Sequence, residues 1–310
     1  MGWRFDAPPK DRWIVALEWI SNIDKYGDLP PITVKWDGDY FADREGATYN
    51  IRAWAECPQP VLGEIHRIRQ SMPSLTRDII IEEYEGVFVA RDDYYPGGTK
   101  ARIFSLFYDQ YDEVVYACSA LSWSQLSLAL TAKTLGKRAT IFCAARASRT
   151  LQTSEAAALG AGIHEIKPGY LSVVRARAES YVRWSDRYLA PLGFDTPEVI
   201  EALSKIAVTI PLSPDEVWCA SGSGVLTRSL QKAWPQAKHH AVQVGKVSDT
   251  GKANVHVYDK PFEYECKFSP PFPCEKNYDR KAWELCSKTK GGGKVLFWNV
   301  VGDHSCFTLP

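Results

Sequence analysis

Strand and helix patterns alternate along residues 112–188, and this alternation restricts the possible folds more than any other feature of the chain. Short apolar runs are each followed, after a brief polar or glycine-containing link, by apolar residues at helical spacing. Strands that alternate with helices in this way indicate βαβ units and a parallel sheet. The pattern predicts strands at 113–118, 139–143 and 162–166, and helices at 125–135, 153–159 and 171–188.

A second block of the same kind follows Pro211. Its apolar runs predict strands at 216–220 and 239–244, separated by a glycine–serine turn and a helix at 225–234. A helix at 278–287 and a last apolar strand at 294–301 complete the block. Both blocks therefore predict an α/β fold.

The N-terminal quarter is less informative. Apolar residues at helical spacing predict a helix at 12–26, and the pattern at 32–41, turning at Asp37-Gly38, predicts a pair of strands. A short helix is expected near Ile65 and Ile68. The β-branched and aromatic run at 78–90 predicts a strand that leads into the first motif with chemical content.

Composition limits the functional classes. With 310 residues, 45% hydrophobic and 24% charged, the chain is expected to form a globular protein with a substantial core. A formal net charge of zero argues against a dedicated nucleic-acid coat or a polybasic membrane binder. Without a signal-like segment or an apolar run of membrane length, we expect a cytoplasmic protein. The eight cysteines lack a C-x-x-C pair, so we expect reduced thiols and no metal site.

Lys100 stands in a polar turn, residues 91–102, between the strand run and an apolar helix. Gly97 and Gly98 allow a tight turn just before it. Near the positive end of a helix dipole and partly desolvated, the amine of Lys100 should have a lowered pKa, and a neutral amine can form a Schiff base. Taken alone, a solvated lysine at a helix start is the simpler interpretation.

Two later segments offer further candidates. The strand, S-G-S-G turn and helix around Ser221–Gly224 form an arrangement in which backbone N–H groups can bind a phosphate, although the turn alone is a weak signal. The segment N-Y-D-R-K-A-W places Tyr278 and Asp279 before the last strand. An N-cap or first-turn carboxylate is the alternative role for Asp279.

In this order and spacing the three features resemble fold-type-II pyridoxal-phosphate enzymes of the tryptophan synthase β-like superfamily. The similarity is nearest to the branch that includes 1-aminocyclopropane-1-carboxylate deaminase and D-cysteine desulfhydrase. That branch carries R-x-D and then G-G-N-K-x-R. Here Arg91, Asp92 and Asp93 precede G-G-T-K-A-R at 97–102, with Thr99 in place of the asparagine.

The resemblance implies two open, mostly parallel sheets with helices on both faces and an active site in the cleft between two domains. Residues 1–104 and 206–310 would form a larger, discontinuous cofactor-binding domain. Residues 105–205 would form a smaller α/β domain. A homodimer is expected.

The resemblance also implies roles for individual residues. Lys100 would be the internal-aldimine lysine and a catalytic residue, with Tyr278 as an acid or base near the substrate. Asp279 would face the pyridine nitrogen. The cofactor phosphate would be held by the loop that corresponds to the family's G-S-G-G-T, namely Ser221, Gly222, Ser223, Gly224, Val225, Leu226 and Thr227.

The family's S-N-H-x segment corresponds to Ser122, Trp123, Ser124 and Gln125. Ser122 would be catalytic and would bind the substrate carboxylate together with donors from Ser124 and Gln125. Trp123 occupies the position of the cofactor-contacting asparagine and cannot make the contact of that asparagine. This departure leaves the reaction type open.

We therefore expect a pyridoxal-phosphate-dependent enzyme of the lyase or deaminase type. It would form an external aldimine with an amino acid, or an amine derived from one, and cleave a bond at Cα. One alternative is a phage-type enzyme that modifies an amino acid attached to a thymine base in DNA. Another is a non-catalytic homologue that binds a ligand or a partner.

Overall fold

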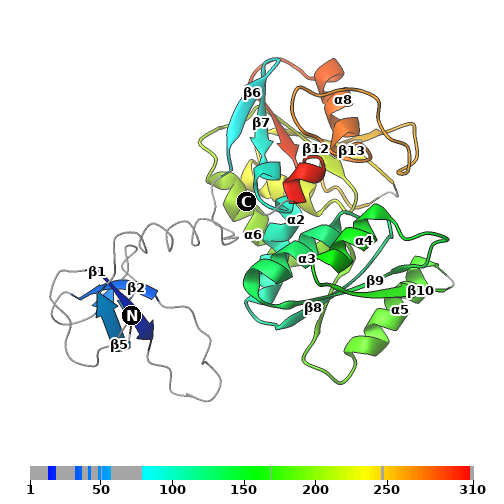
Figure 1. Ribbon diagram of the computed structural model, residues 1–310. Coiled ribbons are helices and arrows are strands. Elements are labelled where there is room, and N and C mark those ends of the chain that lie inside the picture. The colour runs from blue at the N-terminus through cyan, green and yellow to red at the C-terminus, as the bar shows by residue number, and fades with distance from the viewer. Residues whose placement is uncertain are drawn as a thin grey trace. The chain divides into compact units, whose positions relative to one another are not determined.

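The computed structural model describes residues 79–307, except 168, 246–247 and the side chains of 304–305, together with the backbone of five strands within residues 13–56. The chain divides into two compact units, Met1–Met72 and Pro73–Pro310 (Figure 1). Within the described ranges, no helix is both long enough and apolar enough to cross a membrane.

The first unit contains a five-stranded antiparallel sheet in the order β4-β3-β2-β1-β5. The predicted strand pair at 32–41 is confirmed by β2 and β3. The helix predicted at 12–26 is wrong for residues 13–18, which form strand β1. A short apolar run is compatible with a helix or a strand, and here β1 pairs with β2 on one side and β5 on the other. The expected helix near Ile65 lies outside the described residues. The strands are β1 (Trp13–Glu18), β2 (Ile32–Trp36), β3 (Phe41–Ala42), β4 (Thr48–Tyr49) and β5 (Ile51–Glu56).

The smaller sheet of the second unit has four parallel strands in the order β10-β9-β8-β11. Figure 1 shows α3 and α4 on one side of this sheet and α5 on the other. Alternate residues of a strand face opposite sides, so Val115 and Ala117 pack with Val174 and Ala178 of α5. The elements are β8 (Glu113–Cys118), α3 (Ser124–Leu135), β9 (Arg138–Ala144), α4 (Leu151–Ala158), β10 (Gly162–Ile166), α5 (Leu171–Val182) and β11 (Tyr188–Ala190).

The helix predicted over 171–188 is too long. It ends at Val182, because Arg183 has a non-helical ψ of 130° and Trp184 has a φ of 64°, and residues 188–190 form a strand instead. The helix that follows, α6 (Pro197–Val208), was not predicted, although Thr196 caps it and Pro197 opens it as such helices commonly begin.

The larger sheet has six strands in the order β14-β13-β12-β15-β7-β6, all parallel except β6. The run predicted as one strand at 78–90 is a hairpin, because Glu85 and Gly86 turn the chain with φ values of 53° and 73°. The remaining elements of the second unit are the strands of this sheet and the helices around it: β6 (Ile81–Tyr84), β7 (Val87–Arg91), η2 (Asp92–Tyr94), α2 (Gly98–Tyr108), η3 (Leu192–Phe194), β12 (Glu216–Ser221), α7 (Val225–Ala233), β13 (Lys238–Gln243), β14 (Asn254–Val257), α8 (Asp279–Thr289), β15 (Val295–Asn299) and η4 (His304–Phe307).

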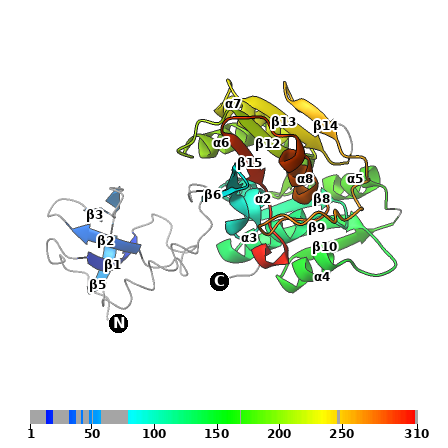
Figure 2. The same ribbon diagram turned by 90° about the horizontal axis from the view of Figure 1, so that it is seen from above.

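Helices cover both faces of this sheet. Along β12, Val217 and Cys219 belong to the core shared with α6 and α7, whereas Trp218 and Ala220 pack on the opposite face with Trp283 of α8. Figure 2 shows α6 and α7 on one side of the strands and α8 on the other. The period-two alternation of apolar side chains thus creates two cores, one for each helical layer.

The carboxyl ends of three strands carry segments singled out by the sequence. Lys100 follows β7, Ser122 follows β8, and Ser221 ends β12. Because β7, β12 and β15 are parallel neighbours, their carboxyl ends share one edge of the sheet. Loops at this edge are where open α/β sheets bind ligands.

Candidate active site

Lys100 is the third residue of α2, in a turn built by two glycines. Gly97 and Gly98 have φ values of 86° and 67°, in the left-handed region that glycine tolerates. A Cβ on Gly98 would lie 2.2 Å from the carbonyl oxygen of Val300, which also accepts a hydrogen bond from the Thr99 N–H at 3.0 Å. The close approach of these two backbone segments fixes where the lysine leaves the helix.

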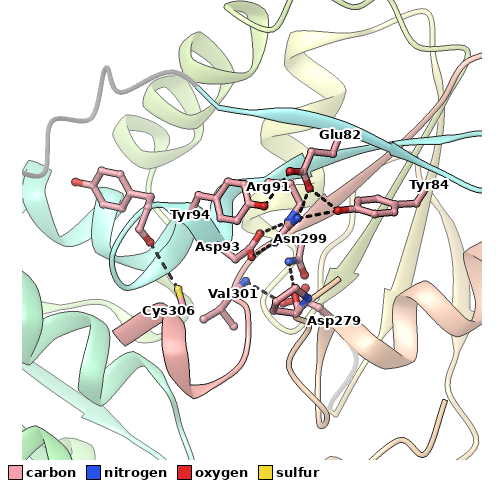
Figure 3. A network of polar contacts seen from close by, with 11 residues as sticks. Glu82, Tyr84, Arg91, Asp93, Tyr94, Asp279, Asn299, Val301 and Cys306 are labelled. Atoms are coloured by element: carbon pink, nitrogen blue, oxygen red, sulfur yellow. Dashed lines mark hydrogen bonds and ion pairs between the residues drawn. The ribbon is translucent and has the colours of Figure 1, made fainter. Parts of the chain in front are cut away.

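Arg91, the arginine of the R-D-D motif, stabilises the segment that leads into this turn. Arg91 donates two hydrogen bonds to Asp93, at 2.9 and 2.8 Å, and also pairs with Glu82 and Tyr84 on the neighbouring strand. Figure 3 shows these groups converging on the guanidinium. The side chain of Arg91 is buried, so its charge is balanced within the fold and not by water.

Asp92 makes a second buried pair on the other side of the turn. It accepts hydrogen bonds from Arg102 at 2.6 Å and from the hydroxyl of Thr99, which in turn accepts from the indole of Trp298 at 3.0 Å. None of these side chains points into the large cavity described next. Thr99, in the position of the family's asparagine, thus belongs to the structural support of Lys100.

A cavity of about 600 Å³ opens beside Lys100. Burial lowers the pKa of the Lys100 amine, against the opposing influence of the acidic groups Asp279, Cys118 and Glu275. The direction agrees with the sequence prediction, and burial is its main cause. A larger fraction of the amine is therefore neutral and nucleophilic near neutral pH than for an exposed lysine.

A pocket of about 50 Å³ lies at the start of α7, beside Lys100. Gly224, with a φ of 79°, opens the helix, and the hydroxyl of Ser221 is buried without a hydrogen-bond partner. Among the described residues, no backbone carbonyl accepts from the N–H groups of residues 223–227. This pocket combines the free donors and the positive end of a helix dipole that an anion requires, and it is lined by every residue of the predicted loop, Ser221, Gly222, Ser223, Gly224, Val225, Leu226 and Thr227.

Tyr278 and Asp279 lie at the start of α8, where the sequence placed them. Tyr278 lines both cavities, its ring centroid lies 5.8 Å from Lys100 Nζ, and its hydroxyl donates to the Ala220 carbonyl at 3.3 Å. Burial raises the pKa of Tyr278 and also, strongly, that of Asp279.

Asp279 is fully buried and does not line either cavity directly. One of its oxygens accepts from the Val301 N–H at 3.1 Å (Figure 3), and the other has no partner among the described groups.

The segment predicted to bind a substrate carboxylate is only partly exposed to the cavity. Ser122, Trp123 and Ser124 line it. Gln125 does not, because its amide donates to the carbonyls of Ser119 and Ala120 and accepts from Thr153. The side chain of Gln125 therefore holds the turn before α3 and has no free donor for a ligand.

Glu275 is the residue of this cavity that sequence reasoning missed. It is 5% exposed, and its carboxylate accepts from the indole N–H of Trp123 at 3.1 Å and from the Asn277 N–H at 2.8 Å. Burial raises the pKa of Glu275, and the lysine charge nearby opposes this. The residue lies in an irregular loop without a motif, so only its position three residues before Tyr278 could have drawn attention to it.

Several solved structures resemble this chain. No protein-family model and no curated protein matches it. A homologue of ACC deaminase has a TM-score of 0.60 at 15% identity, covering 77% of this chain and 94% of that one. A hydrogen sulfide-producing enzyme from Fusobacterium nucleatum gives 0.56 at 14% identity, covering 76% and 96%. An O-acetylserine-dependent cystathionine β-synthase from Helicobacter pylori gives 0.54 at 13% identity, covering 75% and 95%.

These similar structures are all fold-type-II pyridoxal-phosphate enzymes. At such identities the similarity establishes the fold, and the two mostly parallel sheets with helices on both faces are those of fold type II. The fold expected from the sequence is therefore confirmed.

Proposed function

We propose that this protein is a pyridoxal-phosphate-dependent enzyme of the lyase or deaminase type, acting on an amino acid or an amine derived from one. The observation that carries the proposal is the position of Lys100, whose amine has a lowered pKa between a cavity of substrate size and an anion pocket at the start of α7. The three structures reported above support the general class, since they are enzymes of this kind.

Two orphaned buried atoms fit this cofactor. The Ser221 hydroxyl lies in the anion pocket and would donate to the phosphate, together with the N–H groups at the start of α7. The free oxygen of Asp279, which does not line either cavity directly, is the acceptor proposed for the ring nitrogen. When bound, pyridoxal phosphate withdraws electrons from a bond to the amine-bearing carbon of the substrate.

Lys100 and Tyr278 would move the protons. The Lys100 amine would attach the cofactor and, once released by the incoming substrate amine, accept or return a proton at the substrate carbon. Because burial raises the pKa of Tyr278, its hydroxyl stays protonated at neutral pH and would act as a donor. Trp123 and Phe307, stacked with centroids 5.1 Å apart, would help to exclude water from the cavity.

Reconstitution tests the proposal. The purified chain, mixed with pyridoxal phosphate and freed from excess, should show a visible absorption band that borohydride removes. Lys100→Ala should lack the band, whereas Lys205→Ala, at an exposed lysine of α6, should keep it. A colourless wild-type protein at saturating cofactor would refute the cofactor assignment, and a band of equal strength in Lys100→Ala would refute the role of the lysine.

A further inference from the structure

We propose that the substrate is an amine without a free α-carboxylate, and that Glu275 receives a cationic or N–H donor group of that substrate. The inference rests on the proposed function and names the substrate class of the same cavity. Its grounds are the closed hydrogen bonding at the start of α3, the charges that line the cavity, and the geometry of Glu275.

The start of α3 offers few donors to a carboxylate. The N–H of Ser122 bonds to the Ser119 carbonyl at 3.0 Å, that of Ser124 to the Ser122 hydroxyl at 3.3 Å, and that of Gln125 to the Ser122 carbonyl at 3.2 Å. Three of the backbone donors that normally attract an anion to a helix start are thus used within the turn. The start of α7, whose N–H groups have no such partners among the described carbonyls, is the opposite case.

The charges of the cavity are also unfavourable for an anion. Lys100 is the only lysine or arginine among the described residues that line it, and three carboxyl groups line it as well: Asp195, Asp249 and Glu275. Asp195 and Asp249 share Arg228, at 2.7 and 3.7 Å. Once Lys100 holds the cofactor, no lysine or arginine remains among the described lining residues to pair with a substrate carboxylate, and the nearby Arg228 is paired with Asp195 and Asp249.

Glu275 lines the cavity and can accept hydrogen bonds from a substrate. A carboxylate can accept about four hydrogen bonds, and the described donors to Glu275 are the indole of Trp123 and the backbone N–H groups of Asn277 and Tyr278. These donors hold the carboxylate at the cavity wall and leave acceptor capacity toward the interior. The indole N–H of Trp123 is thus one of the donors that fix this acidic group.

The mouth of the cavity suits an uncharged substituent in place of the carboxylate. Leu171 and Leu192 line the cavity and are 41% and 45% exposed. Apolar side chains at a cavity edge bind an amide, ester or larger neutral group more readily than an ion, whose desolvation would be uncompensated.

Matched ligand pairs test the substrate class. The reconstituted holoenzyme would be titrated with L-alanine and L-alaninamide, and with L-lysine and its amide, following the absorbance of the bound cofactor. We expect the amides to bind at least about tenfold more tightly, equivalent to about 1.4 kcal/mol. Equal or tighter binding of the free acids, or no shift with either member of both pairs, would overturn the inference. If the proposed function itself were wrong, no cofactor band would form at the outset.

Two variants test the role of Glu275. Glu275→Gln keeps an acceptor for Trp123 but removes the charge, and we expect it to reduce the preference for the amide to about threefold or less, that is, by more than about half a kcal/mol. Trp123→Phe, which retains a ring to stack on Phe307, should weaken amide binding without creating affinity for the acid. Unchanged discrimination in Glu275→Gln, with an unaltered circular dichroism spectrum and cofactor band, would refute the assignment.

Discussion

Burial of the Lys100 amine destabilises the fold and, at the same time, makes the amine more reactive by lowering its pKa. Its pKa is lowered from 10.5 by burial, so the native chain binds fewer protons than the unfolded chain between the lowered pKa and 10.5. In that window the free energy of unfolding must rise with pH. The penalty is greatest on the acidic side, where the buried amine would have to be charged.

Replacing this amine should remove the pH dependence. We expect Lys100→Met to be more stable than the wild type without cofactor at pH 7, with the difference shrinking as the pH approaches 10.5. Urea unfolding of both chains at several pH values measures this. A difference that is independent of pH would show that the lysine is not destabilised by burial of its charge.

The Ser221 hydroxyl is predicted to serve a ligand and not the fold. Because it is buried without a partner, Ser221→Ala should change the free energy of unfolding by less than about 0.5 kcal/mol, yet raise the Kd for pyridoxal phosphate roughly fivefold to tenfold. Ser229→Ala, at a buried hydroxyl that bonds to the Val225 carbonyl within α7, is the matched control and should leave the Kd unchanged. Equal affinities for Ser221→Ala and wild type would remove Ser221 from the anion site.

At the scale of elements, the turn between β7 and α2 depends on its buried ion pairs. Asp92 is fully buried, and Asp92→Asn would remove the carboxylate that pairs with the buried Arg102, costing about 3 kcal/mol or more. Asp112→Asn breaks the exposed pair with Lys137 and should cost less than about 1 kcal/mol. Chemical denaturation compares the two, and similar losses would contradict the assigned role of the buried pair.

His240 lies on β13, between β12 and β14, and its protonation should lower the stability of the fold. His240 stacks on Trp218 at 4.0 Å and bonds to His256 at 2.8 Å, and burial lowers its pKa from 6.5 to about 4. The unfolded chain therefore binds more protons between pH 6.5 and 4, and stability should fall as the pH drops through this window, by up to roughly 3 kcal/mol. Unfolding of His240→Leu over the same range should lack this part of the loss, and an identical slope would contradict the assignment.

Sequence patterns predicted the strands that local signals mark better than the other elements. The strands at 113–118 and 162–166 have the predicted bounds, because glycine turns and β-branched runs mark them locally. Residues 13–18 and the end of α5 were misassigned, since strand pairing and the positive φ of Trp184 depend on the tertiary context. The exposed edge strand β14 has too weak an apolar pattern to be seen from sequence.

For the whole molecule, the order of the motifs was predictable and their fine geometry was not. Lys100, the Ser221 turn and Tyr278 line two cavities that share lining residues, because each follows or faces the carboxyl end of a parallel strand, which the motif spacing indicated. The inward position of Glu275 depends on a hydrogen bond between residues 152 positions apart, and the closed turn around Gln125 depends on bonds within one loop. No local sequence pattern encodes either of them. The homodimer, the cytoplasmic location and the division at residues 104 and 206 stay predictions.

The central claim is that Lys100 attaches the cofactor of this molecule. The direct measurement is borohydride reduction of the protein reconstituted with pyridoxal phosphate, followed by proteolysis and mass spectrometry of the peptides. The account predicts a pyridoxyl group on Lys100, close to one per chain, that is absent from Lys100→Ala. A modification found mainly on other lysines, or to the same extent in Lys100→Ala, would contradict it.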